Sequence, residues 1–149
     1  MIERAGPDEV DAIRNLVARA YAKWVGVTPR KPKPMTADYD AAIGMHRFDL
    51  LYRSGELAGL IETVIANGEL MIVNIAIDPR HQGKGLGSSL MRHAEQLARA
   101  SNLRGTRLYT NKLMTENIEL YERLGYRFEK ETQHEGGMVA VHMVLPLGN

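Results

Sequence analysis

The part of this sequence that most restricts its fold is a buried strand that leads through a glycine-rich loop into a helix. Residues 69–77 (ELMIVNIAI) are nearly all apolar, a pattern typical of a central strand buried on both faces. Asp78 and Pro79 end this strand. The segment 83–87 (GKGLG) then places glycine at every second position, where an amphipathic helix is expected to begin over residues 86–101. This order of elements predicts an α/β unit with a ligand site at the loop.

The glycine loop has the properties of a phosphate site. Glycine allows the backbone to approach a ligand closely and to adopt dihedral angles that a Cβ atom would forbid. The start of the following helix offers unpaired N–H groups and the positive end of the helix dipole, which favour a bound phosphate. Arg80 and Lys84 add two local positive charges. We therefore expect a pyrophosphate to bind here; a tight strand-to-helix turn without a ligand is the alternative.

The spacing of the glycines separates this loop from two common nucleotide-binding motifs. The P-loop requires Ser or Thr directly after Gly-Lys, whereas Lys84 is followed by Gly85. The dinucleotide-binding fingerprint requires G-x-G-x-x-G after the first strand of a βαβ unit. Here the glycines are spaced G-x-G-x-G and lie in the middle of the chain, after several strands of antiparallel character. Neither motif accounts for the loop.

Hydrophobic periodicity and turn residues predict the other elements. The expected order is β-α-α-β-β-β-α-β-α-β-β, a mixed α/β sheet with helices on both faces. Asn67-Gly68 predicts a hairpin turn between two apolar runs. The expected helices cover residues 6–23, 36–43, 86–101 and 116–124. The expected strands cover residues 48–53, 56–65, 69–77, 107–111, 126–131 and 139–145.

Length and composition exclude several classes of protein. With 149 residues, the chain has the length of one domain, and we expect residues 1–149 to form a single domain. The formal net charge is only +1, which gives no reason to expect nucleic acid or a membrane as a partner. The sequence has no cysteine, which excludes disulfides, a cysteine nucleophile and thiolate metal sites. The histidines have no metal-ligand spacing, and we expect a cytoplasmic protein without a bound metal.

The hexapeptide 82–87 (QGKGLG) resembles the Q/R-x-x-G-x-G/A motif that opens the central helix of the GNAT superfamily of acyl-CoA N-acyltransferases. The end of the preceding strand (75–79), the segment 120–126 (LYERLGY) and the order of elements are also similar, so the resemblance covers essentially the whole chain. It implies an α/β (α+β) fold with a mixed, mostly antiparallel twisted sheet of six to seven strands. It also implies an N-acetyltransferase that moves an acetyl group from acetyl-CoA directly to a primary amine.

The resemblance implies roles for individual residues. The backbone of Ile75, Ala76 and Ile77 should diverge from the neighbouring strand and bond the pantetheine arm and the thioester carbonyl. Tyr121 corresponds to a tyrosine that protonates the departing thiolate, although its helical spacing also suits a core aromatic. Asn117 lies one helical turn before Tyr121 and is a further candidate contact to the cofactor. The residues expected around the pyrophosphate are Gln82, Gly83, Lys84, Gly85, Leu86, Gly87 and Ser88.

Two positions depart from the family pattern. Many relatives carry a CoA-contacting asparagine where this chain has Met114, and some carry a catalytic glutamate where it has Met71. The general base is therefore unassigned. Glu62 is the only acid within a predicted strand core, and it is either the base or part of a solvated face. His46 precedes a strand that borders the expected acceptor groove, but a structural role is the simpler interpretation.

A basic, proline-rich segment lies between the first two expected helices. Its prolines oppose regular helix, so we expect residues 25–35 to form an exposed loop. In the superfamily this region forms one wall of the acceptor groove. We expect a mobile lid that favours acidic acceptors; a plain surface loop is the alternative. The prolines and basic residues concerned are Pro29, Pro32, Pro34, Arg30, Lys31 and Lys33, with Lys23 shortly before them.

The sequence leaves the acceptor and one alternative function open. The acceptor is either a small-molecule amine or a protein amine, and the protein is either a monomer or a homodimer. The alternative function is a non-catalytic acyl-CoA-binding or regulatory module that has lost acceptor chemistry, which would fit the departures at Met71 and Met114. Both functions predict binding of coenzyme A. Only the enzyme releases free thiol when it is given an amine.

Overall fold

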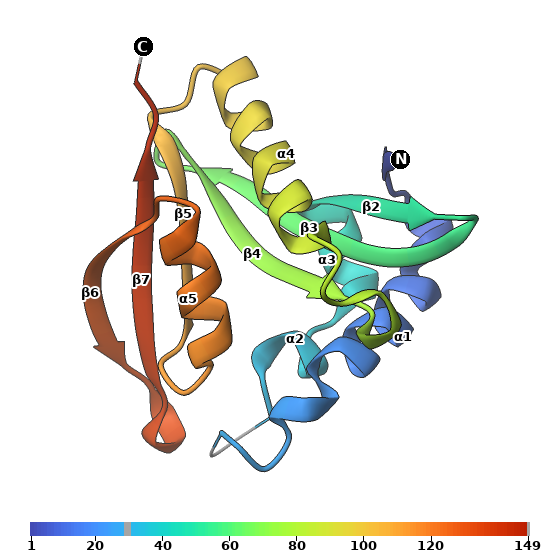
Figure 1. The fold of residues 1–149 in the computed structure, drawn as a ribbon, viewed down its shortest axis with the longest axis horizontal. Coiled ribbons are helices and arrows are strands. Elements are labelled where there is room, and N and C mark those ends of the chain that lie inside the picture. Colours follow the sequence, from blue (N-terminus) through green and yellow to red (C-terminus); the bar gives the residue numbers. More distant parts are fainter. Residues whose placement is uncertain (29–30, 149) are drawn as a thin grey trace.

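A seven-stranded sheet with the order β1-β2-β3-β4-β5-β7-β6 runs through the molecule (Figure 1). The computed structural model describes residues 1–28 and 31–148. The sheet is mostly antiparallel, because of its neighbouring pairs only β4–β5 is parallel. The mixed sheet and the number of strands expected from the sequence are confirmed. The strands are β1 (Ile2–Arg4), β2 (Arg47–Arg53), β3 (Glu56–Ala66), β4 (Glu69–Ile77), β5 (Gly105–Asn111), β6 (Arg127–Gln133) and β7 (Val139–Pro146).

Helices cover both faces of this sheet, as expected (Figure 1). Two of them, α4 and α5, pack on one face, and α1 and α3 pack on the other. No helix in the described ranges is long and apolar enough to cross a membrane. The α-helices are α1 (Val10–Tyr21), α2 (Lys33–Thr36), α3 (Tyr39–Met45), α4 (Leu86–Ala100) and α5 (Thr115–Arg123), and the short 3-10 helices are η1 (Pro7–Glu9), η2 (Ala22–Trp24), η3 (Pro79–His81) and η4 (Glu135–Gly137).

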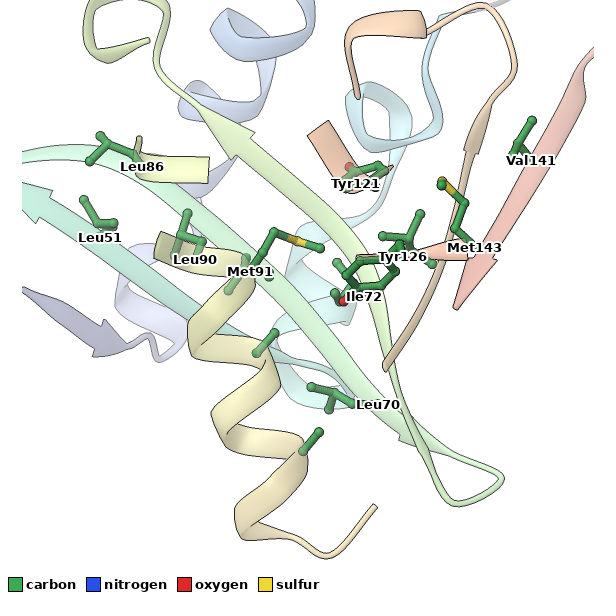
Figure 2. Close-up of a cluster of buried hydrophobic side chains, with 14 of the residues drawn as sticks. Leu51, Leu70, Ile72, Leu86, Leu90, Met91, Tyr121, Tyr126, Val141 and Met143 are labelled. Carbon is green, nitrogen blue, oxygen red and sulfur yellow. The ribbon is translucent and has the colours of Figure 1, made fainter. Parts of the chain in front are cut away.

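Two hydrophobic clusters hold these layers together. The α4 cluster lies between the sheet and the helices α4 and α5. Figure 2 shows Met91 extending from α4 toward Ile72 and Tyr126 within it. The α1 cluster lies on the opposite face, where α1 buries Ile13 and Leu16 completely. Removing these apolar surfaces from water is the main stabilising contribution to such a layered fold.

The parallel pairing of β4 with β5 is short. It joins residues 70–72 of β4 to residues 106–108 of β5. Beyond that point the two strands diverge, and Figure 1 shows them together at one end and apart at the other. On its other edge, β5 pairs with β7 over residues 105–111. The divergence expected for residues 75–77 is confirmed, and no strand within residues 1–28 and 31–148 pairs with this edge of β4 beyond Ile72.

A β-bulge at Val73 marks the point of divergence. Glu62 of β3 pairs with Asn74, and the next residue of β3 pairs with Ile72, so Val73 is the extra residue. The bulge reverses the direction of the side chains: Ile72 packs in the α4 cluster, whereas Asn74 bonds Tyr21 of α1. Helices thus cover both faces of β4. The expectation that this strand is buried along its whole length is wrong for Val73. That residue is 40% exposed.

The proline-rich segment contains a helix where none was expected. Helix α2 begins at Lys33, within the range expected to be loop. Pro34 lies in the first turn of α2, where a missing N–H breaks no intrahelical bond. The helix expected over residues 36–43 is confirmed as α3 with shifted bounds, because α2 ends at Thr36 and α3 begins only after the N-cap residue Asp38. The position of a proline within a turn, more than its presence, decides whether helix forms.

Gly105 begins β5 where this strand and β7 approach closely. A Cβ atom added there would lie 2.5 Å from the Leu145 carbonyl oxygen and 3.1 Å from Pro146 Cα. Neither backbone atom can move without disturbing the strand pair. We expect Gly105→Ala to lower the free energy of unfolding by about 1–3 kcal/mol, as overpacking of a core does. Urea denaturation followed by circular dichroism measures this change.

Gly44 in α3 provides the control for that substitution. Nothing lies within 4 Å of a Cβ atom added there. Alanine in a helix is also more favourable than glycine by about 0.5–1 kcal/mol, so Gly44→Ala should keep or raise the stability. A Gly105→Ala variant as stable as Gly44→Ala would contradict the close approach of β5 and β7.

Candidate active site

The glycine loop enters α4 in a left-handed conformation. Gly83 and Gly85 have φ angles of 77° and 75°, a region that favours glycine. Gly85 is the N-cap residue of α4, and no side chain in the described part of the chain caps this helix. Because the Ser89 N–H bonds the Gly85 carbonyl at 3.1 Å, the N–H groups of residues 86–88 have no partner within the helix. This end of α4 therefore has the features of an anion site.

The residues expected around the pyrophosphate lie together here, and each is limited in what it can contribute. Gln82 and Lys84 are exposed, so their side chains can reach a ligand. Leu86 is buried in the α4 cluster, which leaves only its backbone available. A Cβ atom added to Gly87 would lie 3.4 Å from a leucine side chain of α5, so this glycine brings the two helices close together. Ser88 is partly buried at the first turn.

Asp78 fixes the end of β4 and the start of the loop. Its buried carboxylate accepts bonds from the Arg80 backbone N–H (2.9 Å), the Arg80 guanidinium (3.1 and 3.2 Å) and Arg19 Nε of α1 (3.0 Å). The bond from the Arg80 side chain above all holds the pKa of Asp78 well below its usual range. Arg80 was expected to add positive charge to the phosphate site. Its charge is instead shared with Asp78.

The unpaired edge of β4 presents the backbone of Ile75 and Ile77. The Asp78 N–H bonds a β3 carbonyl at 2.8 Å, and in an antiparallel pair every second residue exchanges such bonds, so Ala76 bonds β3 as well. The N–H and C=O groups of Ile75 and Ile77 therefore face away from β3. The Tyr21 hydroxyl lies 2.9 Å from the Ile75 carbonyl oxygen, which fits this direction. Of the three residues expected to bond the cofactor through their backbone, Ile75 and Ile77 remain candidates.

A cleft of about 970 Å³ opens where β4 and β5 diverge, and side chains from α1, α2, α3 and α5 complete its lining. A bonded chain of polar side chains lines it. The Tyr21 hydroxyl donates to Asn74 Oδ1 (2.8 Å), the Asn74 amide donates to the Tyr39 hydroxyl (3.2 Å), and Tyr39 donates to the Pro34 carbonyl (2.6 Å). Burial raises the pKa of both phenols, so both keep their protons at neutral pH.

Tyr121 reaches the same cleft from α5. Its ring is buried in the α4 cluster, with its centroid 6.2 Å from that of Tyr126 (Figure 2). Its hydroxyl makes no hydrogen bond with any residue that the structure describes. Burial raises the pKa of the Tyr121 phenol, so the group holds its proton at neutral pH. The ring thus belongs to the core, as one interpretation of the sequence had it, while the residue also lines the cleft.

Glu62 and His46, which the sequence offered separately, form a pair in the cleft. His46 Nδ1 lies 2.6 Å from Glu62 Oε2. The Glu62 side chain is 5% exposed and the His46 side chain 26%. Burial raises the pKa of the Glu62 carboxyl, and the bonds from His46 and Asn74 offset part of this rise. Because the carboxyl is buried in the cleft, its assignment to a solvated face is wrong.

The two departures from the family pattern lie in different places. Met114 borders the cleft beside Asn117, whose amide contacts the Met114 sulfur at 3.7 Å. Asn117 in turn lies one turn of α5 before Tyr121, as expected. Met71 lies in the paired part of β4, opposite Arg107, and does not belong to the described lining of the cleft.

Two lysines of the basic segment belong to the cleft lining. Lys33 Nζ lies 5.7 Å from the centroid of the Tyr109 ring, a cation–π contact that joins α2 to β5. Lys31 lines the cleft beside it. Lys23 instead forms an ion pair with a glutamate of α5 at 2.8 Å. Arg30 lies outside the described residues, and a mobile lid that favours acidic acceptors stays a prediction.

Sequence reasoning did not single out Tyr21, Tyr39 and Asn74, which form the polar chain in the cleft. One signal was available: Asn74 is the only polar residue in the apolar run 70–77, and a polar group in a buried strand needs a partner. Tyr21 and Tyr39 lie among the apolar residues of helices, and nothing in the sequence shows where their hydroxyl groups point.

Known proteins resemble this chain in sequence and in fold. The model of the acetyltransferase (GNAT) family matches residues 10–126. The streptothricin acetyltransferase of Streptomyces lavendulae is 36% identical over 76 residues, which make up 50% of this chain and only 40% of that protein. The ribosomal-protein-S18-alanine N-acetyltransferase of Escherichia coli has a TM-score of 0.81 at 23% identity, over 98% of this chain and 92% of its own. The PaiA N-acetyltransferase of Thermoplasma acidophilum, in complex with coenzyme A, has a TM-score of 0.78 at 15% identity, over 95% and 98%. The similarities to these two solved structures show a shared fold only.

The raised pKa of Glu62 predicts how this residue affects stability. The folded state holds the Glu62 proton to a higher pH than the unfolded chain, whose glutamate pKa is about 4.3. The contribution of Glu62 to stability is therefore present below that pH and is lost as the pH rises through the folded pKa. At pH 7.5, Glu62→Gln removes a buried charge, and we expect the variant to have the higher free energy of unfolding. This difference should shrink toward pH 4.

Urea denaturation of both proteins between pH 4 and 7.5 measures the effect. Glu131→Gln is the control, because it removes an exposed carboxylate that pairs with Lys112 at 2.9 Å and should change stability by less than about 0.5 kcal/mol. A Glu62→Gln variant that is less stable than the wild type at pH 7.5 would mean that the bond to His46 outweighs the cost of burial.

Proposed function

Because the chain belongs to the acetyltransferase (GNAT) family, we propose that it transfers an acetyl group from acetyl-CoA directly to a primary amine. Membership makes the chain an acyltransferase. We propose, beyond this, the acetyl donor, the amine acceptor and the residues that act on them. The alternative, an acyl-CoA-binding module without acceptor chemistry, is less consistent with a cleft that contains both buried acidic and phenolic groups.

One observation carries this proposal: the glycine loop and the unpaired edge of β4 adjoin each other. The loop that follows β4 contains Gly83 and Gly85, and Cβ atoms added to them would meet nothing within 4 Å. A pyrophosphate fits the N–H groups of residues 86–88, and the amides of an extended pantetheine arm fit the outward backbone groups of Ile75 and Ile77 as an added strand would. The thioester then lies in the cleft between β4 and β5.

Direct transfer suits the side chains that this cleft contains. The sequence has no cysteine, so an acyl-enzyme on a thiol is excluded. Holding the amine and the thioester in line supplies much of the rate by proximity. A backbone N–H near Ile77 stabilises the oxyanion of the tetrahedral intermediate. As the C–S bond breaks, the protonated Tyr121 hydroxyl donates to the thiolate.

The acceptor is proposed as a primary amine of a small molecule or of a protein. The names of the similar proteins differ on this point, since one acetylates streptothricin and the other an alanine of a ribosomal protein. The match to the streptothricin acetyltransferase covers half of this chain, and the similarity to the ribosomal-protein acetyltransferase is one of fold alone. The cleft contains a buried carboxyl, Glu62, together with Lys31 and Lys33, so an acceptor that carries an anionic group besides its amine belongs in the panel.

A thiol-release screen tests this function. The purified chain is incubated with acetyl-CoA and a panel of amines: amino acids, polyamines, streptothricin and peptides with a free N-terminus. Amine-dependent release of free thiol supports the enzyme. Calorimetric binding of acetyl-CoA without such release favours the non-catalytic module, and the absence of binding contradicts both functions.

Tyr121→Phe tests the proposed proton donor. The substitution keeps the ring that packs in the α4 cluster and removes only the hydroxyl. General acid catalysis typically supplies about 10²–10⁴-fold, so we expect kcat to fall by at least about a hundredfold. The affinity for acetyl-CoA, measured by calorimetry, should change little. A variant whose kcat stays within about twofold of the wild type would assign Tyr121 to the core alone.

A further inference from the structure

Direct transfer requires a group that removes a proton from the incoming amine. A primary alkylamine has a pKa near that of lysine, about 10.4, so at pH 7 nearly all of it is ammonium. Ammonium has no lone pair with which to attack the thioester carbonyl. A base within the cleft is therefore needed, and the position at which some relatives carry a catalytic glutamate is Met71 here.

The pair of His46 and Glu62 has the geometry for this task. Glu62 Oε2 lies 2.6 Å from His46 Nδ1, and Glu62 pairs in register with Asn74 of β4. When Glu62 is ionised it accepts the Nδ1–H of His46, which leaves Nε2 as the proton acceptor, as in histidine–carboxylate pairs generally. His46 Nε2 makes no hydrogen bond within the described structure, and the histidine is the more exposed partner.

We infer that His46 is the general base of this chain, acting through Nε2 on the acceptor amine, and that Glu62 is the positioning residue that orients its ring. This inference rests on the proposed acetyl transfer and adds to it the residue that activates the acceptor. The pair lines the same cleft as the proposed acid, Tyr121.

The other ionisable groups of the cleft are less suited to accept this proton. Burial keeps the phenols of Tyr21, Tyr39 and Tyr121 protonated at neutral pH, and phenols and alkylammonium groups as classes are poor proton acceptors there. His134 Nε2 is bonded to the Thr132 hydroxyl at 2.8 Å, and Glu135 is exposed in η4. Among the described residues, the ionisable groups that face the cleft besides His46 and Glu62 are Tyr21 from α1, Lys31 before α2, Lys33 from α2, Tyr39 from α3, Tyr109 from β5, Tyr121 from α5, and His134 and Glu135 before β7.

The protons and bonds of the step balance. His46 takes one proton from the ammonium, and the nitrogen lone pair forms the C–N bond with the thioester carbon. The C–S bond breaks as the intermediate collapses, and Tyr121 gives its proton to the sulfur. The nitrogen then loses a second proton, which returns to the Tyr121 phenolate. The proton on His46 leaves to solvent, so ammonium and acetyl-CoA yield amide, free thiol and one proton.

Turnover rates with two different nucleophiles distinguish a general base from a residue that has only a structural role. An alkylamine, namely the one that the wild type acetylates fastest, needs deprotonation at pH 7.5. Hydroxylamine is already unprotonated at that pH and does not need it. We expect His46→Gln to lower kcat for the alkylamine by at least about a hundredfold while hydroxylamine turnover stays within about threefold of the wild type. The alkylamine rate of His46→Gln should also rise about tenfold per pH unit from pH 7 to 9, as neutral amine accumulates.

His93→Gln is the matched control. His93 also faces a buried carboxylate, with Nε2 3.5 Å from Asp49 Oδ1, but it lies outside the cleft, and both nucleophiles should react at the wild-type rate. If His46→Gln lowers the turnover of both nucleophiles equally, His46 has a structural role, and the inference is overturned. An active His46→Gln beside an inactive Glu62→Gln would overturn it too, because Glu62 would then act on the amine directly. A wild type that binds acetyl-CoA but acetylates neither nucleophile would overturn both this inference and the proposed function.

Discussion

The short pairing of β4 with β5 is the constraint on which the rest of this structure depends. Backbone groups that leave a sheet must find other partners, because an unpaired polar group out of contact with water is costly. The bulge at Val73 begins the separation, and beyond it the Tyr21 hydroxyl lies 2.9 Å from the Ile75 carbonyl oxygen. The remaining outward groups of β4 are available to a ligand. Full pairing of the two strands would close this edge and leave no cleft.

The same separation explains why polar side chains lie so deep in this molecule. Tyr21, Tyr39 and Asn74 bond one another along the wall of the cleft that this separation opens, and Glu62 of β3 lines the same cleft opposite Asn74. A buried carboxyl with a raised pKa weakens the fold at neutral pH, and such groups are typical of sites where charge is needed for chemistry. Asp78 has the opposite environment, since its arginine partners stabilise its charge and hold the loop in place.

The sequence predicted those parts of the site that depend on local backbone demands. Positive φ angles at Gly83 and Gly85 require glycine, and that requirement is visible as a motif. The meeting of His46 with Glu62 was not predictable in this way. It depends on the register of β2 against β3, which shifts by one residue between Leu51 and Tyr52. Counting outward from the turn does not reveal such a shift, and a slip of one residue turns a side chain to the other face.

The central claim is that the diverging edge of β4 binds acetyl-CoA through its backbone. Titration of uniformly ¹⁵N-labelled protein with acetyl-CoA, followed by amide chemical shifts, tests it directly. The account predicts that the amides of Ile75 and Ile77 and of residues 83–88 shift together and saturate at one equivalent, whereas those of the paired residues 70–72 hardly move. Saturable binding that leaves the Ile75 and Ile77 amides unchanged would contradict it.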